Sequence, residues 1–255
     1  MARRIEQEFR LVTEVPAEVA TFLDLANWDK ATLLRLLRRI VADHREVFGS
    51  TIAFEPYAFD PDIRFFAPYY YKSKDGIAYE QLGSESYDYV RWDWYHVPKV
   101  LKAPVWSEPF FDEGGGGILM TTYSYPLFEK GKEDQAKKVR AIITADVSLE
   151  WLTKLVCSIR VGHSGYCFIV SDTGIIVTHP RSDLIMTESL FSLAEELKDP
   201  RFREIGRAMI HEKSGFVEFG STLTDEDSFL AYARIPTPGW SLCNIVSLGP
   251  QEILY

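Results

Sequence analysis

The sequence predicts an α+β fold, with a long N-terminal helical region followed by two modules built on antiparallel sheets. Three observations lead to this prediction. Residues 1–48 repeat apolar side chains at helical spacing, whereas most later segments have the shorter period of strands. Short turns separate these strand-like segments, which is typical of antiparallel pairing. A helical stretch at 149–161 divides them into two sets, and we expect the domain boundary there.

The N-terminal region predicts two helices. Residues 3–26 form the first, in which Pro16 is expected to kink the chain or to start a new turn. Asp29 has the side chain of an N-cap and precedes a second amphipathic stretch, 31–48, which Gly49 ends. The apolar faces of these helices are the candidate surface for a homodimer.

From Ser50 the apolar period changes to that of strands. The first set of strands is predicted at 51–54, 65–71, 77–79, 105–106, 118–127 and 139–148. The stretch 84–101 is less regular and predicts short helical turns that end at Pro98. The glycine run 114–117 predicts a hairpin-like loop.

The second set of elements follows a helix predicted at 149–159. Its strands are predicted at 165–170, 175–178, 215–219, 228–235 and 240–246, with helices at 189–197 and 200–211. The hairpins of this half resemble those of the first half, which indicates a weak internal repeat.

Composition narrows the function classes. The chain has 255 residues, of which 46% are hydrophobic and 25% charged, as in ordinary globular proteins. A net charge of −9 without a basic cluster argues against nucleic acid as a partner. No run of about 18 apolar residues could span a membrane, and no apolar signal segment is found. A cytosolic chain and a part excised from between two membrane helices both remain open.

Aromatic side chains and carboxylates gather between residues 87 and 146, as a pocket for a small polar or cationic ligand requires. The candidate ligand-binding residues are Tyr71, Tyr87, Trp92, Trp94, Tyr95, Trp106, Tyr123 and Asp146. Tyr69 shares a strand face with Tyr71, and both either line the pocket or pack in the core. The alternative for the whole group is aromatic core packing, with Asp146 capping the following helix.

Other chemistry is weakly represented. Glu108, Asp112 and Glu113 offer oxygen ligands for calcium, but their irregular spacing favours a solvated loop. His163 and His179 have no partner at ligand spacing, so we expect structural roles and no metal. The glycine run lacks the Lys-Ser/Thr of a phosphate loop.

No nucleophile motif indicates an enzyme, and we expect none, nor any cofactor; a hydrolase built on Asp146 and Glu108 is the alternative. The three cysteines, Cys157, Cys167 and Cys243, are too widely spaced for a disulfide framework or a CxxC site, and we expect buried free thiols.

Several phrases together resemble the double Cache family of bacterial extracytoplasmic sensor domains. They are WxxP at 106–109, TTYSYP at 121–126, AIITADVSLEWL at 141–152, GYCFIVSDTGIIVTHP at 165–180 and GWSL at 239–242. The resemblance implies two PAS-like modules stacked on one long helix. Residues 1–48 would be the helical stalk, 49–150 the membrane-distal ligand-binding module and 151–255 the membrane-proximal module.

The resemblance also implies a membrane-anchored receptor with a cytoplasmic output. The sequence motifs are most similar to those of sensors that precede sigma-factor-regulating serine phosphatases, and next to those of histidine kinases and chemoreceptors. Ligand binding would shift the C-terminal strand, near 240–255, relative to the first helix. The alternative is a ligand-free structural module that transmits dimer state.

In the amino-acid-binding branch of this family, conserved motif positions correspond to Tyr87, Trp94, Tyr95 and Asp146 of this chain. The arginine that grips the ligand carboxylate in that branch is Trp92 here, and Arg91 lies one residue early. A shift of one residue turns a side chain by about 100° on a helix. The resemblance, with this departure, therefore favours an amine over an amino acid, held by an aromatic cage and Asp146.

Overall fold

The computed structural model describes residues 1–25, 28–129, 138–159, 161, 165–220 and 227–247. The chain divides between Ser148 and Leu149 into two compact modules. We call residues 10–148 the N-terminal module, and residues 1–9 together with those from Leu149 onward the C-terminal module. The division into a stalk at 1–48 and functional modules at 49–150 and 151–255 stays a prediction.

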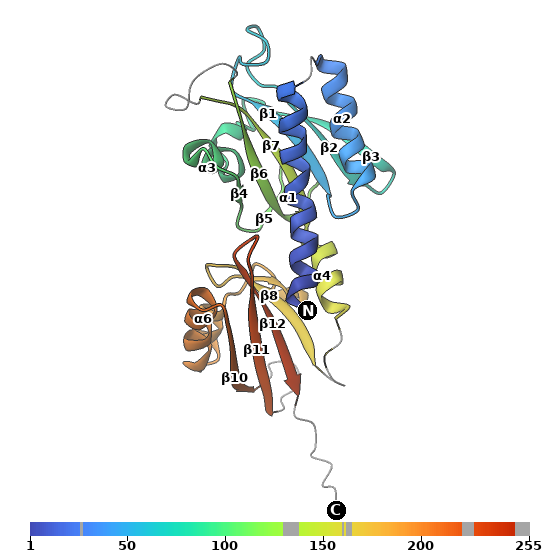
Figure 1. The fold of residues 1–255 in the computed structure, drawn as a ribbon. Coiled ribbons are helices and arrows are strands. Elements are labelled where there is room, and N and C mark those ends of the chain that lie inside the picture. Colours follow the sequence, from blue (N-terminus) through green and yellow to red (C-terminus); the bar gives the residue numbers. More distant parts are fainter. Residues whose placement is uncertain (26–27, 130–137, 160, 162–164, 221–226, 248–255) are drawn as a thin grey trace, which may run out of the picture. The chain divides into compact units, whose positions relative to one another are not determined.

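Two helices open the chain, as predicted (Figure 1). Helix α1 (Ala2–Leu25) continues through Pro16 instead of restarting there. Helix α2 (Lys30–Asp43) begins at Asp29, whose carboxylate accepts a hydrogen bond of 2.8 Å from the backbone N–H of Thr32. The prediction that α2 extends to residue 48 is wrong, because the chain leaves the helix at His44. The Lys72 ammonium donates to the His44 carbonyl oxygen at 2.7 Å and so stabilises this end.

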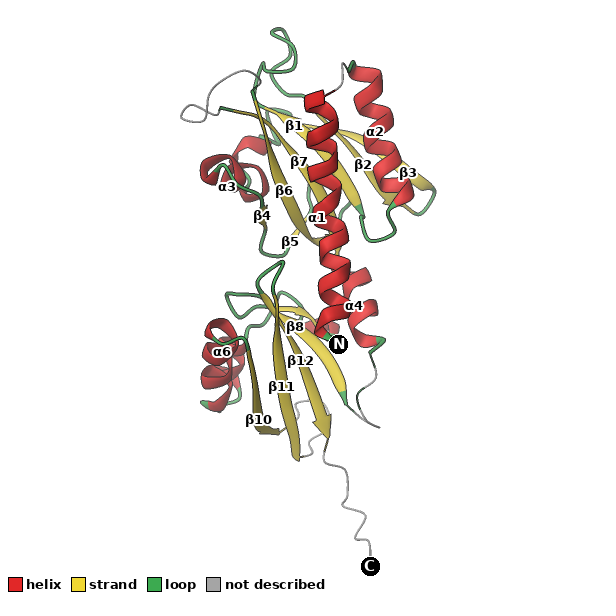
Figure 2. Ribbon diagram, viewed as in Figure 1, coloured by secondary structure: helices red, strands yellow, loops and turns green. Residues whose placement is uncertain are grey.

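The N-terminal module is built on one antiparallel sheet, seen in Figure 2. Its strands are β1 (Gly49–Phe54), β2 (Ala67–Ser73), β3 (Gly76–Leu82), β4 (Val105–Trp106), β5 (Phe110–Phe111), β6 (Leu119–Phe128) and β7 (Val139–Ser148). Their order is β3-β2-β1-β7-β6-β4, and β5 also pairs with β6. Helix α2 packs on β1 and β2, whereas α3 contacts β6, β7 and β4. The two faces of the sheet are therefore covered by different helices.

The irregular stretch after β3 contains a 3₁₀ turn, η1 (Tyr89–Arg91), and helix α3 (Asp93–Leu101). Pro98 lies inside α3, so the prediction that the helical turns end there is wrong. The helix ends instead at Lys102, whose φ of 52° is in the left-handed region. The glycine run joins β5 to β6 as the predicted hairpin, with Phe110 opposite Met120 and Phe111 opposite Leu119.

The C-terminal module has a second antiparallel sheet. After helix α4 (Leu149–Cys157), its elements are β8 (Tyr166–Val170), β9 (Ile176–Thr178), η3 (Ser182–Leu184), α5 (Leu190–Glu196), α6 (Arg201–His211), β10 (Ser214–Gly220), β11 (Asp227–Ile235) and β12 (Trp240–Ser247). The strand order is β10-β11-β12-β8-β9. Apolar residues of α5 and α6 pack against this sheet in one continuous core. Of the C-terminal segment 240–255, which we expect to shift on ligand binding, residues 248–255 lie outside the described residues, as does His163.

The first residues of α1 belong to the C-terminal module because they pack on its β11–β12 turn. Phe9 meets the Trp240 ring edge-on, with ring centroids 5.6 Å apart. The Glu6 carboxylate accepts hydrogen bonds from the backbone N–H of Thr237 at 3.0 Å and from its hydroxyl at 2.6 Å. These contacts fix the start of the helix on the second sheet.

The two sheets repeat one strand order. In the N-terminal module β2, β1, β7 and β6 are successive neighbours, and in the C-terminal module β9, β8, β12 and β11 follow in the same way. Both modules insert helices at the same place along the chain. Helix α3 comes after β1 and β2 and before β6 and β7, and helices α5 and α6 come after β8 and β9 and before β11 and β12. The weak repeat seen in the sequence therefore corresponds to a repeated fold.

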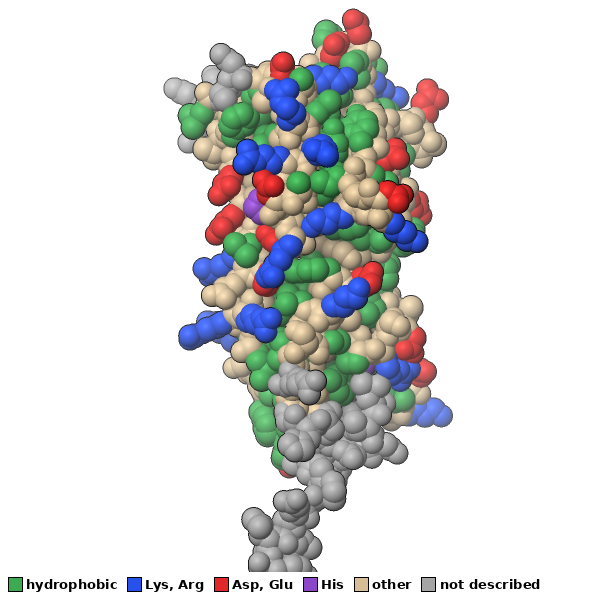
Figure 3. Space-filling view, turned by 90° about the vertical axis from the view of Figure 1, so that its right-hand side faces the viewer, with side chains coloured by type: hydrophobic (Ala, Val, Ile, Leu, Met, Phe, Trp, Pro, Cys, Tyr) green, Lys and Arg blue, Asp and Glu red, His purple; other side chains and the backbone are tan. Residues whose placement is uncertain are grey.

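Two further observations concern the surface. On the face shown in Figure 3, Lys and Arg side chains are interspersed with Asp and Glu, and no continuous basic surface is visible there. Among the described residues, no helix combines the length and the apolar character needed to cross a membrane.

Cys167 and Cys243 are buried free thiols as predicted, but Cys157 is exposed, so that part of the prediction is wrong.

Candidate ligand-binding site

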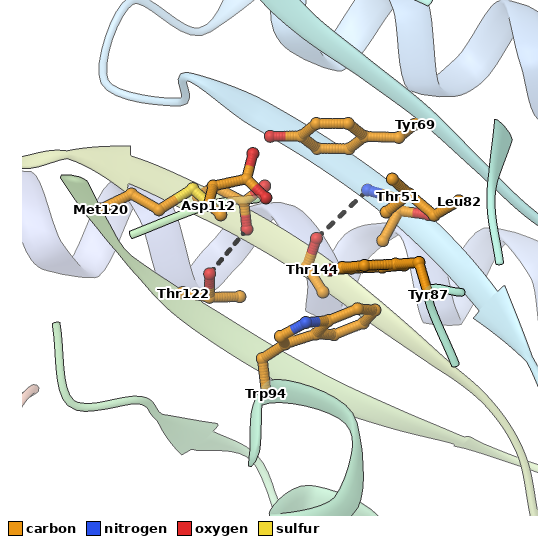
Figure 4. A pocket seen from close by; sticks show the side chains of 10 residues that line it. Thr51, Tyr69, Leu82, Tyr87, Trp94, Asp112, Met120, Thr122 and Thr144 are labelled. Carbon is orange, nitrogen blue, oxygen red and sulfur yellow. Dashed lines mark hydrogen bonds between the residues drawn. The ribbon is translucent and has the colours of Figure 1, made fainter. Parts of the chain in front are cut away.

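A small cavity lies on the face of the N-terminal sheet that α3 covers (Figure 4). Its walls are Thr51, Tyr69, Leu82, Tyr87, Trp94, Asp112, Met120, Thr122, Thr144 and Asp146. The volume open to the centre of a water molecule is about 10 Å³, which is room for roughly one water. A larger ligand must therefore displace some of the side chains that line the cavity.

Strand alternation brings the polar residues of the cavity together. Asp146 of β7 lies directly opposite Thr122 of β6, and Thr144 lies opposite Ser124. Residues two apart on a strand point to the same face, so Asp146 and Thr144 share the cavity face. The Thr122 hydroxyl donates a hydrogen bond of 2.9 Å to Asp146 Oδ1, and the Thr51 backbone N–H donates to Thr144 Oγ1 at 3.1 Å. These contacts account for the position of Asp146 on the sheet, so the alternative in which Asp146 caps the following helix is not required.

Two buried carboxyl groups dominate the electrostatics of the site. Asp146 is 2% exposed and Asp112 is 4% exposed. Burial, and then the charge of Asp112, raise the pKa of Asp146 to about 7. Near neutral pH the Asp146 carboxyl is therefore close to half protonated. No Lys, Arg or His lines the cavity among the described residues, so nothing there neutralises the pair.

The Asp112 carboxylate is held by its own loop. Its Oδ1 accepts a hydrogen bond from the Gly114 N–H at 3.0 Å, and its Oδ2 accepts one from the Gly116 N–H at 2.6 Å. The expectation of a solvated acidic loop is wrong for Asp112, because the turn buries it. The Asp146 carboxyl group accepts from the Thr122 hydroxyl at 2.9 Å, and the Tyr69 and Thr144 hydroxyls also face it as donors.

The same loop lies directly against two tyrosine rings. A Cβ atom built on Gly115 would lie 2.6 Å from the Tyr69 ring, and one on Gly114 would lie 2.7 Å from the Tyr87 ring and hydroxyl. Both distances are shorter than van der Waals contact. Glycine is therefore required for this close approach, and the run 114–117 forms a wall beside the cavity rather than a phosphate loop.

The Tyr69 hydroxyl is the most unusual polar group of the site. It is buried and lies beside the Asp146 carboxyl group, but in the described structure its geometry does not complete a hydrogen bond. Burial, followed by the charges of Asp146 and Asp112, holds the Tyr69 pKa well above its usual value, so the hydroxyl keeps its proton. Figure 4 shows its hydroxyl end directed towards Asp112. A donor placed beside two carboxyl groups can pair with either of them or with a ligand.

The structure brings three of the predicted ligand-binding residues together in the cavity: Tyr87, Trp94 and Asp146. Two more lie directly behind its walls. Trp92 stacks on Tyr87 with ring centroids 5.6 Å apart, and Tyr71 stacks on Tyr69 at 5.3 Å. Neither Trp92 nor Tyr71 lines the cavity itself.

The other three predicted residues lie elsewhere. Tyr95 is adjacent to Trp94 on α3 but is turned into the core, where its hydroxyl donates to Glu55 Oε1 at 2.5 Å. Tyr123 follows Thr122 on β6 and therefore points to the opposite face of the sheet. Trp106 pairs with it, with ring centroids 5.3 Å apart. We leave these three side chains out of the site.

Sequence reasoning missed most of the polar and aliphatic lining. It did not identify Thr51, Leu82, Met120, Thr122 or Thr144, and it named Tyr69 only as an alternative. The alternation of small polar residues in TTYSYP is a signal for the threonines, but only the pairing of β6 with β7 shows which of them face Asp146.

Arg91 does not replace the missing arginine of the amino-acid-binding branch. Its side chain is 84% exposed and pairs with Asp88 at 3.4 Å. His179, considered above as a structural residue, lies in the C-terminal module and is buried.

Comparisons with known proteins agree with this architecture. Residues 33–154 match the family model of the first PDC sensor domain of methyl-accepting chemotaxis protein-like proteins. A stretch of 149 residues is 28% identical to the human voltage-dependent calcium channel subunit alpha-2/delta-3, covering 48% of this chain and 14% of that protein. The chain thus spans only a small part of the length of this relative.

Two solved structures show the fold over nearly the whole chain. The extracellular domain of a protein described as a histidine kinase, mmHK1S-Z3, superposes with a TM-score of 0.78 at 23% identity, covering 97% of this chain and 89% of that one. The ligand-binding domain of the Pseudomonas aeruginosa amino acid chemoreceptor PctC, in complex with GABA, gives 0.65 at 21% identity, covering 96% and 94%. Residues 33–154 thus resemble a PDC sensor domain, and the solved structures show that nearly the whole chain has the double Cache fold of these domains.

Proposed function

We propose that the cavity of the N-terminal module binds a small amine in its protonated form. The observation that carries this proposal is the pair of buried carboxyl groups, Asp112 and Asp146, in a cavity with no basic side chain among the described lining residues. An ammonium group would restore charge balance there. Buried charges are stable only when they are paired, which is why a cation suits this cavity better than an anion.

The aromatic walls suit the same ligand. Tyr69, Tyr87 and Trp94 present ring faces or edges to the cavity, and each cation–π contact stabilises a bound ammonium by roughly 0.5–2 kcal/mol. Trp92 and Tyr71 support these rings by stacking behind Tyr87 and Tyr69. Asp146 would accept the ammonium hydrogen bonds, whereas Asp112 would act through its charge because its oxygens already accept from Gly114 and Gly116.

The ligand of the related PctC domain supports an amine and also shows where this chain differs. GABA carries an ammonium group and a carboxylate. Arg91 is exposed and paired with Asp88, and no described residue that lines the cavity offers a cation for a ligand carboxylate. We therefore favour an amine without a carboxylate over an amino acid.

The small volume of the cavity links binding to a change of shape. A ligand with several heavy atoms must push apart the Tyr87 and Trp94 rings, or the glycine loop at 114–117. Such a ligand favours the open arrangement by its difference in affinity for the two states. We infer that this shift is the signal that the domain passes to the rest of its protein.

The remaining roles belong to the whole protein. We propose a membrane-anchored receptor with a cytoplasmic output, either a serine phosphatase that regulates sigma factors, a histidine kinase or a chemoreceptor, and a homodimer formed through the N-terminal helices. We do not assign an enzymatic activity, since no nucleophile with an adjacent base lines the cavity among the described residues.

The second candidate function is a structural module that binds no ligand. The observation that favours it is the cavity volume, which leaves room for only about one water molecule. A thermal-shift screen against amines, amino acids, carboxylates and purines separates the two. A ligand at 100 times its dissociation constant stabilises by about 2.7 kcal/mol. Stabilisation by amines that Asp146→Asn abolishes would support the sensor; no stabilisation by any class would leave the structural module.

A further inference from the structure

The C-terminal module contains a second enclosed cavity, between its sheet and the helices α5 and α6. Its lining comes from β8, β9, β11, η3, α5 and α6 and is almost entirely apolar. The exceptions are the Tyr166 ring with its hydroxyl and one imidazole, His179. No charged side chain lines it among the described residues, in contrast to the cavity of the N-terminal module.

This second cavity occupies the place in its fold that corresponds to the first. The first cavity lies against β1, β2, β6 and β7, under the inserted helix α3. The second lies against β8, β9 and β11, which hold the positions of β1, β2 and β6 in the repeated strand order, under the inserted helices α5 and α6. Both modules therefore keep a cavity at one topological position, with different chemistry.

His179 is the polar feature of the second cavity. It is 3% exposed, and its Nδ1 accepts a hydrogen bond of 3.0 Å from the backbone N–H of Arg181. Burial lowers the pKa of the imidazole to about 4, so the ring is neutral at ordinary pH. An accepting Nδ1 in a neutral ring requires that Nε2 carries the proton.

In the part of the chain that the structure describes, the hydrogen bond found for the His179 ring is the one at Nδ1. The ring is held on two sides by aromatic neighbours instead, since Tyr166 and Phe168 each approach it edge-on with centroids 5.3 Å away. A protonated Nε2 is a hydrogen-bond donor that the ring can offer to the cavity it lines. An acceptor that entered the cavity could bind this donor.

We propose that the cavity of the C-terminal module is a second ligand site, for a small, uncharged and mainly apolar molecule that carries one hydrogen-bond acceptor. The apolar lining would bury the body of the molecule, and the His179 Nε2–H would donate to its acceptor. A charged ligand does not fit this chemistry, because no described lining residue offers an opposite charge. The two modules would then respond to molecules of different classes.

The cavity must open for such a ligand. The volume available to the centre of a water molecule is about 20 Å³, so a molecule of several heavy atoms displaces lining side chains. Leu190 and Leu193 lie on α5, which has seven residues and is the shorter of the two α-helices that line the cavity. Binding would therefore move α5 relative to the sheet of its own module.

Cyclohexanone tests the proposal, with methylenecyclohexane as a probe of the same shape that lacks the acceptor. The protein is labelled with ¹⁵N in its histidines, and its ring signals are followed by NMR during titration. We expect His179 to show a protonated Nε2 whose signal shifts with cyclohexanone. We expect His179→Phe to weaken cyclohexanone about fivefold, the effect of one neutral hydrogen bond, and to leave methylenecyclohexane unchanged.

Two control variants make each outcome decisive. Asp146→Asn alters only the first cavity and should not change cyclohexanone affinity, whereas Leu193→Phe fills the second cavity and should abolish binding. If His179→Phe does not fold, Leu193→Phe and the His179 signal still test the site. The proposal is overturned if millimolar cyclohexanone leaves the His179 signal unmoved, if Leu193→Phe binds as tightly as the natural chain, or if both probes bind equally.

Discussion

The Thr122 hydroxyl donates a hydrogen bond of 2.9 Å to the buried Asp146 carboxyl group directly across two antiparallel strands. The uncharged hydroxyls of Thr122, Tyr69 and Thr144 do not offset the burial of this carboxylate, and its pKa is raised. Asp146 is therefore held in a state that costs free energy when it is ionised. A residue kept in such a state is a candidate for function, and four predictions follow from the two cavities.

Asp146→Asn should stabilise the free protein at pH 8 and abolish amine binding. The folded pKa of about 7 lies above the ordinary value of 3.8, so the folded state binds more protons than the unfolded state between these values, and stability falls as pH rises through that range. The cost of ionisation is at most ~4 kcal/mol above pH 7. Denaturant unfolding at pH 8 and pH 5 measures it, and the gain in the variant should shrink at pH 5.

Asp75→Asn is the matched control, since Asp75 lies in the exposed β2–β3 turn. It should change neither stability nor binding at either pH. An Asp146→Asn protein that is less stable than the natural chain at pH 8 would show that the carboxylate is needed for the fold, and the ligand proposal would lose its main support.

Amine affinity should rise with pH around neutrality. An ammonium ligand requires the ionised Asp146, and with a free pKa of about 7 the ionised fraction increases about tenfold between pH 6 and pH 8. Binding at pH 6 should also release close to one proton. Titration calorimetry in buffers of different ionisation enthalpy measures both effects. A pH-independent affinity with no proton release would contradict the role of Asp146.

Gly115→Ala should weaken amine binding or prevent it. The added methyl group would lie 2.6 Å from the Tyr69 ring, so either the ring or the loop must shift, at a cost of roughly 1–3 kcal/mol in stability. Gly117→Ala is the control, because nothing lies within 4 Å of its Cβ position and only its φ of +62° is unfavourable. That strain costs about 1 kcal/mol. If the two variants bind the amine with equal affinity, the close approach of Gly115 to Tyr69 does not contribute to the binding site.

Some of these relationships could be predicted from the sequence and some could not. The family motifs and the gathered aromatic residues pointed to Tyr87, Trp94 and Asp146, and these three side chains line one cavity; their role in binding stays a prediction. Tyr123 was assigned to the same site because it is aromatic and near in sequence, yet it lies on the opposite face from Thr122. The choice between neighbours on a strand depends on register, which is set by pairing with β7 and is not written in the local sequence.

Asp112 illustrates a different limit. Its loop has irregular spacing and several glycines, which locally predicts solvent exposure. The structure buries it because the glycines let Tyr69 and Tyr87 pack against the loop backbone. The aromatic partners come from distant segments, so only the tertiary fold shows why glycine is needed there. The same holds for Tyr95, which the turn of α3 directs to Glu55 instead of the cavity.

The last prediction concerns acid stability of the C-terminal module. The pKa of His179 in the folded state, about 4, lies below the ordinary 6.5, so below pH 6.5 the unfolded state binds more protons than the folded state. Stability should therefore be fully present above pH 6.5 and fall by up to ~3 kcal/mol as pH decreases towards 4. Hydrogen exchange of β8 and β9 measures it within this module. His179→Phe should remove this pH dependence while Asp146→Asn retains it, and an unchanged slope in His179→Phe would mean that the imidazole is not held neutral by burial.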